Sequence, residues 1–123
     1  MTTNATTLID RHLEAYGEPD RARRDELIRQ VWAADGRLID PPLDGAGHQG
    51  ISELAEAVQT QFAGHAFRRT TEIDAHHDRL RYGWELVGPG GEVAVAGIDV
   101  AELTGDGRLA VVTGFFGDLQ PRG

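Results

Sequence analysis

The sequence of 123 residues predicts one α+β domain, in which three N-terminal helices pack on a long antiparallel β-sheet that curves around them. Two patterns lead to this prediction. In the first half of the chain, apolar side chains recur every three or four residues, which is the spacing of amphipathic helices. From His65 onward, apolar and polar side chains alternate instead, and the breaks between the alternating segments have hairpin lengths.

The first helix is placed by this periodicity and by residues that favour helix ends. Thr6 or Thr7 is a suitable N-cap, and Gly17 is a suitable C-terminal stop. Its apolar face carries two side chains with polar atoms, His12 and Tyr16, which lie one helical turn apart. We therefore expect both of them to point toward the protein interior.

The second and third helices show the same spacing. The second follows Pro19, a residue suited to a first helical turn, and its apolar face consists of Leu27, Ile28, Val31 and Trp32. The third ends before Gly64, and its apolar face consists of Ile51, Leu54, Ala55, Val58 and Phe62. Between the two helices, a turn at residues 33–36 is expected to lead into a short strand, residues 37–40, which two prolines end.

The segment from Gly45 to Gly50, Gly-Ala-Gly-His-Gln-Gly, matches the glycine spacing of a dinucleotide-binding loop. Such a loop follows a buried strand directly, whereas Pro41 and Pro42 separate this segment from the strand before it. No repeated strand–helix units follow it either. We therefore expect a flexible loop here and no dinucleotide cofactor.

Four strands are expected in the second half of the chain, at residues 66–74, 79–87, 92–103 and 108–116. In the strand 79–87, alternation places one set of side chains on the face opposite to Arg79, Arg81 and Glu85; this set is Leu80, Tyr82, Trp84 and Leu86.

His76 and His77 fall in a polar break and would point in opposite directions on a strand, so we interpret them as a hairpin tip and expect no metal site.

Two carboxyl groups occupy unusual places in this pattern. Asp99 shares its strand face with small or apolar residues only, namely Val93, Val95, Gly97, Ala101 and Leu103. Asp40 ends another apolar strand and points the same way as Leu38. A buried carboxyl group needs a partner or must keep its proton. Either both acids are structural, bonded to a backbone amide or an arginine, or they form a functional site.

Composition excludes several classes of function. The chain has no cysteine and no lysine, and Ser52 is its one serine, which excludes thiolate and Schiff-base chemistry and disfavours a serine triad. A net charge of -8 disfavours nucleic acids and anionic membrane surfaces as partners. No apolar segment approaches the roughly 20 residues of a membrane span. We expect a cytoplasmic protein.

Three segments resemble those of a known family: Ala34-Asp35-Gly36-Arg37-Leu38-Ile39-Asp40-Pro41, Ala96-Gly97-Ile98-Asp99 and Gly114-Phe115-Phe116-Gly117. Together with the order of the elements, they resemble the nuclear transport factor 2-like superfamily, and within it the branch of ketosteroid isomerase and the SnoaL-like polyketide cyclases. The resemblance covers nearly the whole chain. This fold hosts several unrelated chemistries as well as domains with none, so function must be argued from the site.

The resemblance implies a cone-shaped pocket between the helices and the concave face of the sheet. Asp40 would take the place of the isomerase general base, and Asp99 that of its protonated acid, which donates a hydrogen bond to the enolate oxygen. Where the isomerase has a tyrosine donor on its first helix, this chain offers His12, with Tyr16 one turn later. The expected walls of the pocket are Val58, Phe62, Tyr82, Trp84, Leu86 and Phe116.

The leading hypothesis is a cofactor-independent isomerase or polyketide-cyclase-like enzyme that enolises a small hydrophobic ketone. The alternative is a noncatalytic small-molecule-binding or dimerisation domain, and a protein-interaction role is a third possibility. An epoxide hydrolase is disfavoured because Arg79 and Arg81 lie on the face opposite Trp84. The resemblance also suggests a homodimer through the outer sheet face, where one strand presents Ala94, Ala96, Ile98 and Val100.

Overall fold

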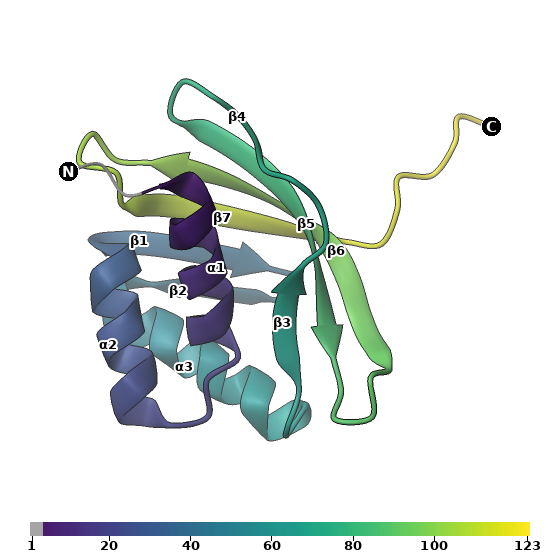
Figure 1. Ribbon diagram of the computed structural model, residues 1–123, viewed down its shortest axis with the longest axis horizontal. Coiled ribbons are helices and arrows are strands. Elements are labelled where there is room, and N and C mark those ends of the chain that lie inside the picture. The colour runs from purple at the N-terminus through teal and green to yellow at the C-terminus, as the bar shows by residue number, and fades with distance from the viewer. Residues whose placement is uncertain (1–3) are drawn as a thin grey trace.

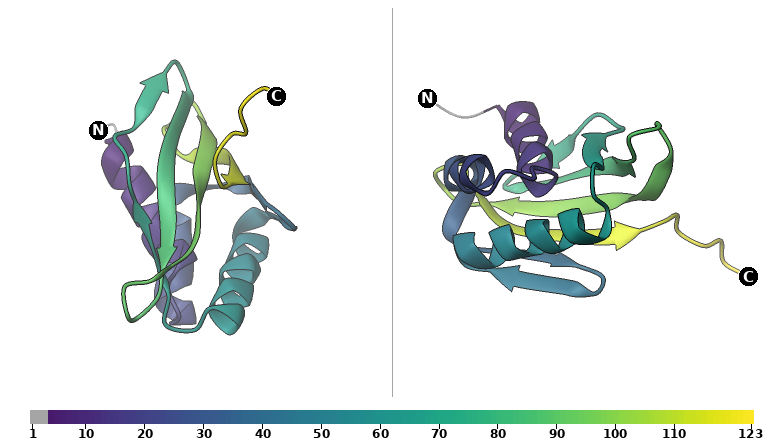
Figure 2. Two further views of the ribbon diagram at one scale, coloured as in Figure 1. Left: turned by 90° about the vertical axis from the view of Figure 1, so that its right-hand side faces the viewer. Right: turned by 90° about the horizontal axis from the view of Figure 1, so that it is seen from below.

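The computed structural model describes residues 4–123, in which three helices cover one face of a curved β-sheet (Figure 1). The helices are α1 (Ala5–Tyr16), α2 (Arg21–Val31) and α3 (Gly47–Gln61). Further views show the sheet curving around the helices and the C-terminal segment extending away from them (Figure 2). The predicted α+β fold class is confirmed.

The sheet contains seven strands: β1 (Trp32–Asp40), β2 (Leu43–Ala46), β3 (Ala66–Arg69), β4 (Asp74–His76), β5 (Arg79–Val87), β6 (Val93–Leu103) and β7 (Leu109–Phe116). Their order is β2-β1-β7-β6-β5-β3, with β4 beside β5. Every pairing is antiparallel except that of β1 with β7. The expected antiparallel sheet is therefore mixed, because β1 and β7 are far apart in the chain and no hairpin fixes their relative direction.

The expected N-cap of the first helix and the expected turn after the second helix both need correction. Asn4 is the N-cap of α1, rather than Thr6 or Thr7; its side chain accepts a hydrogen bond from the Thr6 amide at 2.8 Å. Residues 33–36 belong to β1 instead of forming a turn, and Trp32 begins this strand. The register of β1 against β7 shifts across these residues, and a Cβ at Gly36 would overlap the Trp32 ring. Gly36 thus leaves room for the Trp32 ring at an irregularity of the strand, and the sequence of this irregularity resembles that of a turn.

The segment from Gly45 to Gly50 is not a loop. Gly45 and Ala46 end β2, which forms a hairpin with β1, and α3 begins at Gly47 with a φ of 76°. Glycine adopts this backbone conformation without a steric penalty, which explains why it occurs at the change from strand to helix. The predicted apolar face of α3 is confirmed, since Ile51, Ala55 and Val58 are buried.

In the second half, β5, β6 and β7 begin within one residue of the predicted positions and end where predicted. The expected strand 66–74 instead divides into β3 and β4, which pair with different parts of β5. Between them, Thr70 and Thr71 bond to the backbone of Gly83. The alternation predicted for β5 and β6 is confirmed, because the inner side chains of β5 are buried and those of β6 are less exposed than the outer ones, apart from Val93 at its start.

The buried apolar side chains form one cluster between the helices and the inner face of the sheet. None of the helices in residues 4–123 combines the length and the apolar character that crossing a bilayer requires. The polar interior positions are few, and two of them, Asp40 and Asp99, are the carboxyl groups singled out by the sequence. Their burial makes this part of the sheet the place to look for a site.

Candidate active site

Four residues form a row across four neighbouring strands of the inner sheet face. Tyr82 of β5 is paired in register with Asp99 of β6, and Asp99 is paired with Gly114 of β7. On the other side of β7, Ile39 pairs with Thr113, so the next residue of β1, Asp40, lies beside Gly114. Strand register therefore brings together two acids that are 59 positions apart in the sequence.

Gly114 makes the approach of the two acids possible. A Cβ built on this glycine would overlap Asp40 Oδ1 and would lie 3.0 Å from Asp99 Oδ1. Both carboxyl groups thus converge on the space that a side chain at position 114 would occupy. The sequence identifies this glycine only as a member of the family-like segment Gly114-Phe115-Phe116-Gly117, because nothing local distinguishes it from a glycine that packs without consequence.

Asp40 lies at the end of β1 and is 6% exposed. Its Oδ2 accepts a hydrogen bond of 3.0 Å from the Tyr16 hydroxyl, while its Oδ1 is buried without a partner among the described residues. Burial raises the pKa of Asp40, and the hydrogen bond from Tyr16 acts in the opposite direction. Tyr16 itself has a raised pKa because it is buried beside this carboxyl group, so its hydroxyl remains a donor.

Asp99 lies in the middle of β6 and is 5% exposed. Its Oδ2 accepts a hydrogen bond of 2.7 Å from the Tyr82 hydroxyl; no arginine or backbone amide of the described residues bonds to it. Burial and, secondly, the charge of Asp40 raise the pKa of Asp99 to about 7. Tyr82 and the Trp84 indole N–H lower the pKa, although Trp84 does not reach hydrogen-bond geometry.

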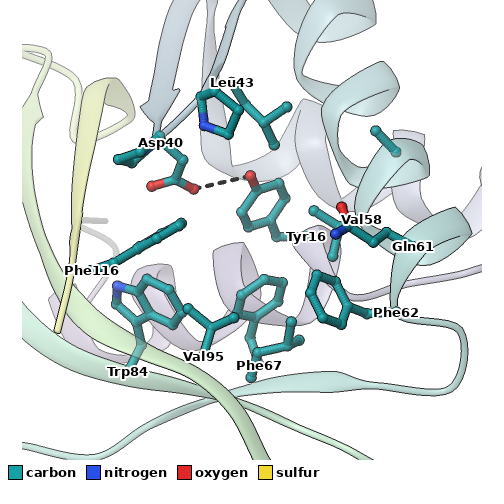
Figure 3. A pocket seen from close by; sticks show the side chains of 14 residues that line it. Tyr16, Asp40, Leu43, Val58, Gln61, Phe62, Phe67, Trp84, Val95 and Phe116 are labelled. Atoms are coloured by element: carbon teal, nitrogen blue, oxygen red, sulfur yellow. Dashed lines mark hydrogen bonds between the residues drawn. The ribbon is translucent and has the colours of Figure 1, made fainter.

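A cavity of about 240 Å³ opens beside Asp40, and most of its lining is apolar (Figure 3). Five of the six predicted wall residues line it, namely Val58, Phe62, Trp84, Leu86 and Phe116. The sixth, Tyr82, is buried and is not part of the lining, because it faces Asp99. Seven further lining residues were not predicted from the sequence: Pro41, Pro42, Leu43, Ala57, Gln61, Phe67 and Val95. Among them, the ring of Phe67 stacks on Tyr16.

Three polar side chains belong to this lining. Asp40 and Tyr16 meet at one side of the cavity, and Gln61 lies across from them on α3 (Figure 3). Among the described residues of the lining, Asp40 is the one with a charged type of side chain. The lining also contains the aromatic rings of Tyr16, Phe62, Phe67, Trp84 and Phe116. The geometry therefore presents a single carboxyl group to whatever occupies an otherwise apolar space.

His12 does not line the cavity, although it shares the inner face of α1 with Tyr16. It is 1% exposed and lies between Tyr16 and Trp32, with ring centroids 5.9 Å and 5.4 Å away. Burial lowers its pKa to about 4, so the imidazole is neutral near pH 7. Of the two donors expected on this helix, the structure brings Tyr16 to the cavity and places His12 behind it.

The histidine pair and the arginines lie away from this site. His76 and His77 are exposed at the β4–β5 turn, as the hairpin-tip interpretation predicts. The arginines of β5 extend from the outer face, where Arg81 binds Asp74 and Arg79 binds Glu102. Within residues 4–123, no group of three potential ligands is arranged to hold a metal ion.

The curved sheet, the three helices that cover it and the apolar cavity between them place the protein in the nuclear transport factor 2-like class. Solved structures described as nuclear transport factor 2-like, ketosteroid isomerase-like and SnoaL-like share this fold. One of them is a proposed isomerase of the SnoaL-like family from Agrobacterium tumefaciens str. C58. It is 35% identical over 92% of this chain and 97% of its own, with a TM-score of 0.86. The chain belongs to the SnoaL-like family.

More distant structures establish the fold alone. A proposed polyketide cyclase from Sinorhizobium meliloti is 14% identical, with a TM-score of 0.67 over 89% of this chain and 94% of that one. A protein from Catenulispora acidiphila DSM 44928, solved in complex with trimethylamine, is 13% identical. Its TM-score is 0.72, and the match covers 94% of this chain and 86% of that one. Scans against protein-family models and curated proteins found no match.

Proposed function

We propose that the protein is a cofactor-independent enzyme that enolises a small hydrophobic ketone, as an isomerase or a polyketide-cyclase-like enzyme, with Asp40 as the general base. The observation that carries the proposal is the position of Asp40, the single charged side chain in the lining of an apolar cavity. A carboxylate in such surroundings is poorly hydrated, which makes it a stronger base than it is in water. Family membership supports the same chemistry.

In this proposal, Asp40 removes a proton from the carbon next to the ketone. The C–H electrons form the enolate double bond, and the negative charge moves to the former carbonyl oxygen. Asp40 then returns the proton to another carbon, or the enolate carbon attacks a second carbonyl group. The oxygen needs a hydrogen-bond donor, and the lining offers the Gln61 amide, whereas the one proton of the Tyr16 hydroxyl is donated to Asp40. Asp99 and His12 lie behind the lining, so they act through Asp40 and Tyr16.

Binding of naphthols and phenols tests this proposal, because their oxygen resembles that of an enolate. Asp40→Asn imitates the protonated base and removes the negative charge near that oxygen, so we expect the variant to bind these ligands at least about tenfold more tightly than the wild type. Quenching of tryptophan fluorescence reports binding, since Trp84, one of the two tryptophans, lines the cavity. Asp35→Asn removes an exposed carboxylate from the same strand and serves as the control. Equal affinities of wild type and Asp40→Asn contradict the proposal.

The second candidate is a noncatalytic binding domain for a small amine. The specific observation is a carboxyl group in a cavity that is also lined by aromatic rings, which suits an alkylammonium ion, and a structure with the same fold contains trimethylamine. This candidate predicts that trimethylamine binds the wild type, that Asp40→Asn loses most of the affinity, and that the neutral, similarly shaped tert-butanol binds neither. Equal binding of the amine and the alcohol contradicts it.

We also propose that the protein is a cytoplasmic homodimer that pairs through the outer sheet face. Ile98 and Phe115 are neighbours on this face and are 42% and 58% exposed, which is unusual for large apolar side chains on adjacent strands. Sedimentation analysis of the wild type and of Phe115→Ser tests the pairing. We expect a dimer and a monomer, respectively; a monomeric wild type contradicts it.

A further inference from the structure

The starting observation is a buried oxygen without a partner. Asp40 Oδ2 is bonded to Tyr16, whereas Asp40 Oδ1 is inaccessible and has no donor among the described residues. A buried carboxylate oxygen without a donor is strongly unfavourable. The carboxyl oxygen nearby is Asp99 Oδ1. A Cβ built on Gly114 would overlap Asp40 Oδ1 and would lie 3.0 Å from Asp99 Oδ1. The two oxygens therefore face the same small space.

We propose that Asp40 and Asp99 form one carboxyl pair that shares a single proton across Gly114, so that Asp99 is a positioning residue that acts on the ligand through Asp40. In this arrangement Asp99 keeps the proton and donates it to Asp40 Oδ1, which supplies the missing partner. The catalytic meaning of the pair rests on the function proposed above, whereas the pair itself does not. Asp99 is outside the cavity lining, which agrees with an indirect role.

The groups around the pair favour this distribution of the proton. Asp40 faces the cavity and accepts a hydrogen bond from Tyr16 of α1, so it is the better place for the negative charge. Asp99 is enclosed between β5 and β7, and its titration is moved to about pH 7, which agrees with a retained proton. From β5, Tyr82 donates to Asp99, and the Trp84 N–H lies nearby. Behind Tyr16, His12 is neutral near pH 7, and no arginine contacts either acid by hydrogen bond or ion pair within residues 4–123.

Titration of aspartate side-chain carbons by NMR tests the pair without any substrate. In the wild type, the Asp40 signal should titrate in two steps, the second coinciding with the step of Asp99 near pH 7. In Asp40→Asn, the pKa of Asp99 should fall by about one pH unit or more, because the neighbouring charge is gone. Asp35→Asn should leave the pKa of Asp99 unchanged. An unchanged pKa in Asp40→Asn overturns the proposal.

If Asp40→Asn does not fold, the wild type still decides the question, because a single-step titration of Asp40 also overturns the pair. Gly114→Ala tests the geometry separately. Its methyl group should displace the Asp40 carboxyl group and lower the pKa of Asp99 in the same direction as Asp40→Asn. Gly105→Ala is the matched control, because a Cβ there meets nothing within 4 Å. A folded Gly114→Ala with wild-type titration overturns the role of the glycine.

These measurements distinguish the failure of the pair from the failure of the proposed enzyme. Titration needs no turnover, so a coupled pair in a protein that enolises nothing leaves the inference intact and removes the function. Conversely, an active enzyme whose two acids titrate independently retains Asp40 as base and leaves Asp99 a structural residue.

Discussion

The Asp40–Tyr16 pair and the Asp99–Tyr82 pair have the same chemistry in different surroundings. In each pair a tyrosine hydroxyl donates to a carboxyl Oδ2, and in each the acid is almost fully buried. Asp40 is the last residue of β1, directly before Pro41 and Pro42, and its side chain lines the cavity. Asp99 lies in the middle of β6, with a paired strand on each side, and is not in the lining.

The difference shows how backbone position assigns the two acids to separate tasks. A carboxyl group that lines a cavity can exchange a proton with a ligand, whereas one enclosed by neighbouring strands can only influence its neighbours. Burial raises the pKa of both acids. The hydrogen bond from Tyr16 opposes this effect at Asp40, and the charge of Asp40 adds to it at Asp99. These surroundings raise the pKa of Asp99 by two effects and that of Asp40 by one that Tyr16 opposes, which supports the proposed retention of the proton on Asp99.

The largest expected effect is the loss of catalysis in Asp40→Asn. An amide cannot accept the α-proton, so turnover of a ketone substrate should fall by about 10²–10⁴-fold. Asp99→Asn should lose much less, about tenfold or below, because its amide N–H can still donate to Asp40. Steady-state kinetics of both variants measure the contrast. Equal losses in the two variants would mean that both acids touch the substrate.

A smaller effect is expected in the pH dependence of stability. Both acids have raised pKa values in the folded state, so between about pH 4 and pH 7 these two groups bind more protons in the folded chain than in the unfolded chain. Their contribution to the free energy of unfolding should therefore fall as the pH rises through this range, whereas His12, whose pKa burial lowers to about 4, contributes in the opposite direction. Asp99→Asn removes the contribution of Asp99 alone, so its stability relative to the wild type should rise with pH and exceed that of the wild type above pH 7, by up to a few kcal/mol, since one pKa unit corresponds to about 1.4 kcal/mol.

Denaturant unfolding of the wild type and Asp99→Asn at pH 5 and pH 8 measures this difference, with Asp35→Asn as the control for the loss of an exposed carboxylate. A stability difference between wild type and Asp99→Asn that is the same at both pH values contradicts the raised pKa of Asp99.

The smallest expected effect separates the two tyrosines. Tyr82→Phe leaves an enclosed carboxyl oxygen without its donor, so it should raise the pKa of Asp99 and destabilise the protein by about 1–3 kcal/mol at pH 8. Tyr16→Phe should raise the pKa of Asp40 with a smaller loss of stability, because Asp40 lines a cavity that admits water. Thermal unfolding and carboxyl titration of the two variants compare them; a greater loss of stability in Tyr16→Phe reverses the expected order.

Much of the fold was predictable because its signals are local. Alternation along β5 and β6 reports which face is buried, and amphipathic spacing reports the helices. The errors arose where a distant partner decides the structure. Residues 33–36 form a strand irregularity between Trp32 and Arg37, which pair with Leu109 and Val111 of β7, and this pairing is not visible in the local sequence.

The candidate site was predictable only in part for the same reason. An acid among apolar residues identifies Asp40 and Asp99, but only strand register shows that Gly114 lies between them. His12 and Tyr16 share a helix face, but only Tyr16 reaches the cavity. His12 packs against Trp32 and Tyr16 packs against Phe67. Periodicity cannot resolve such differences.

Exchange of α-protons for deuterium tests the central claim most directly, because it detects enolisation without knowledge of the natural product. A panel of small ketones, including cyclohexanone and 2-tetralone, is incubated in D₂O and followed by NMR with wild type, Asp40→Asn and the control Asp35→Asn. The account predicts that wild type and control accelerate exchange of at least one ketone that Asp40→Asn leaves at the uncatalysed rate. Exchange that Asp40→Asn catalyses as fast as the wild type would contradict it.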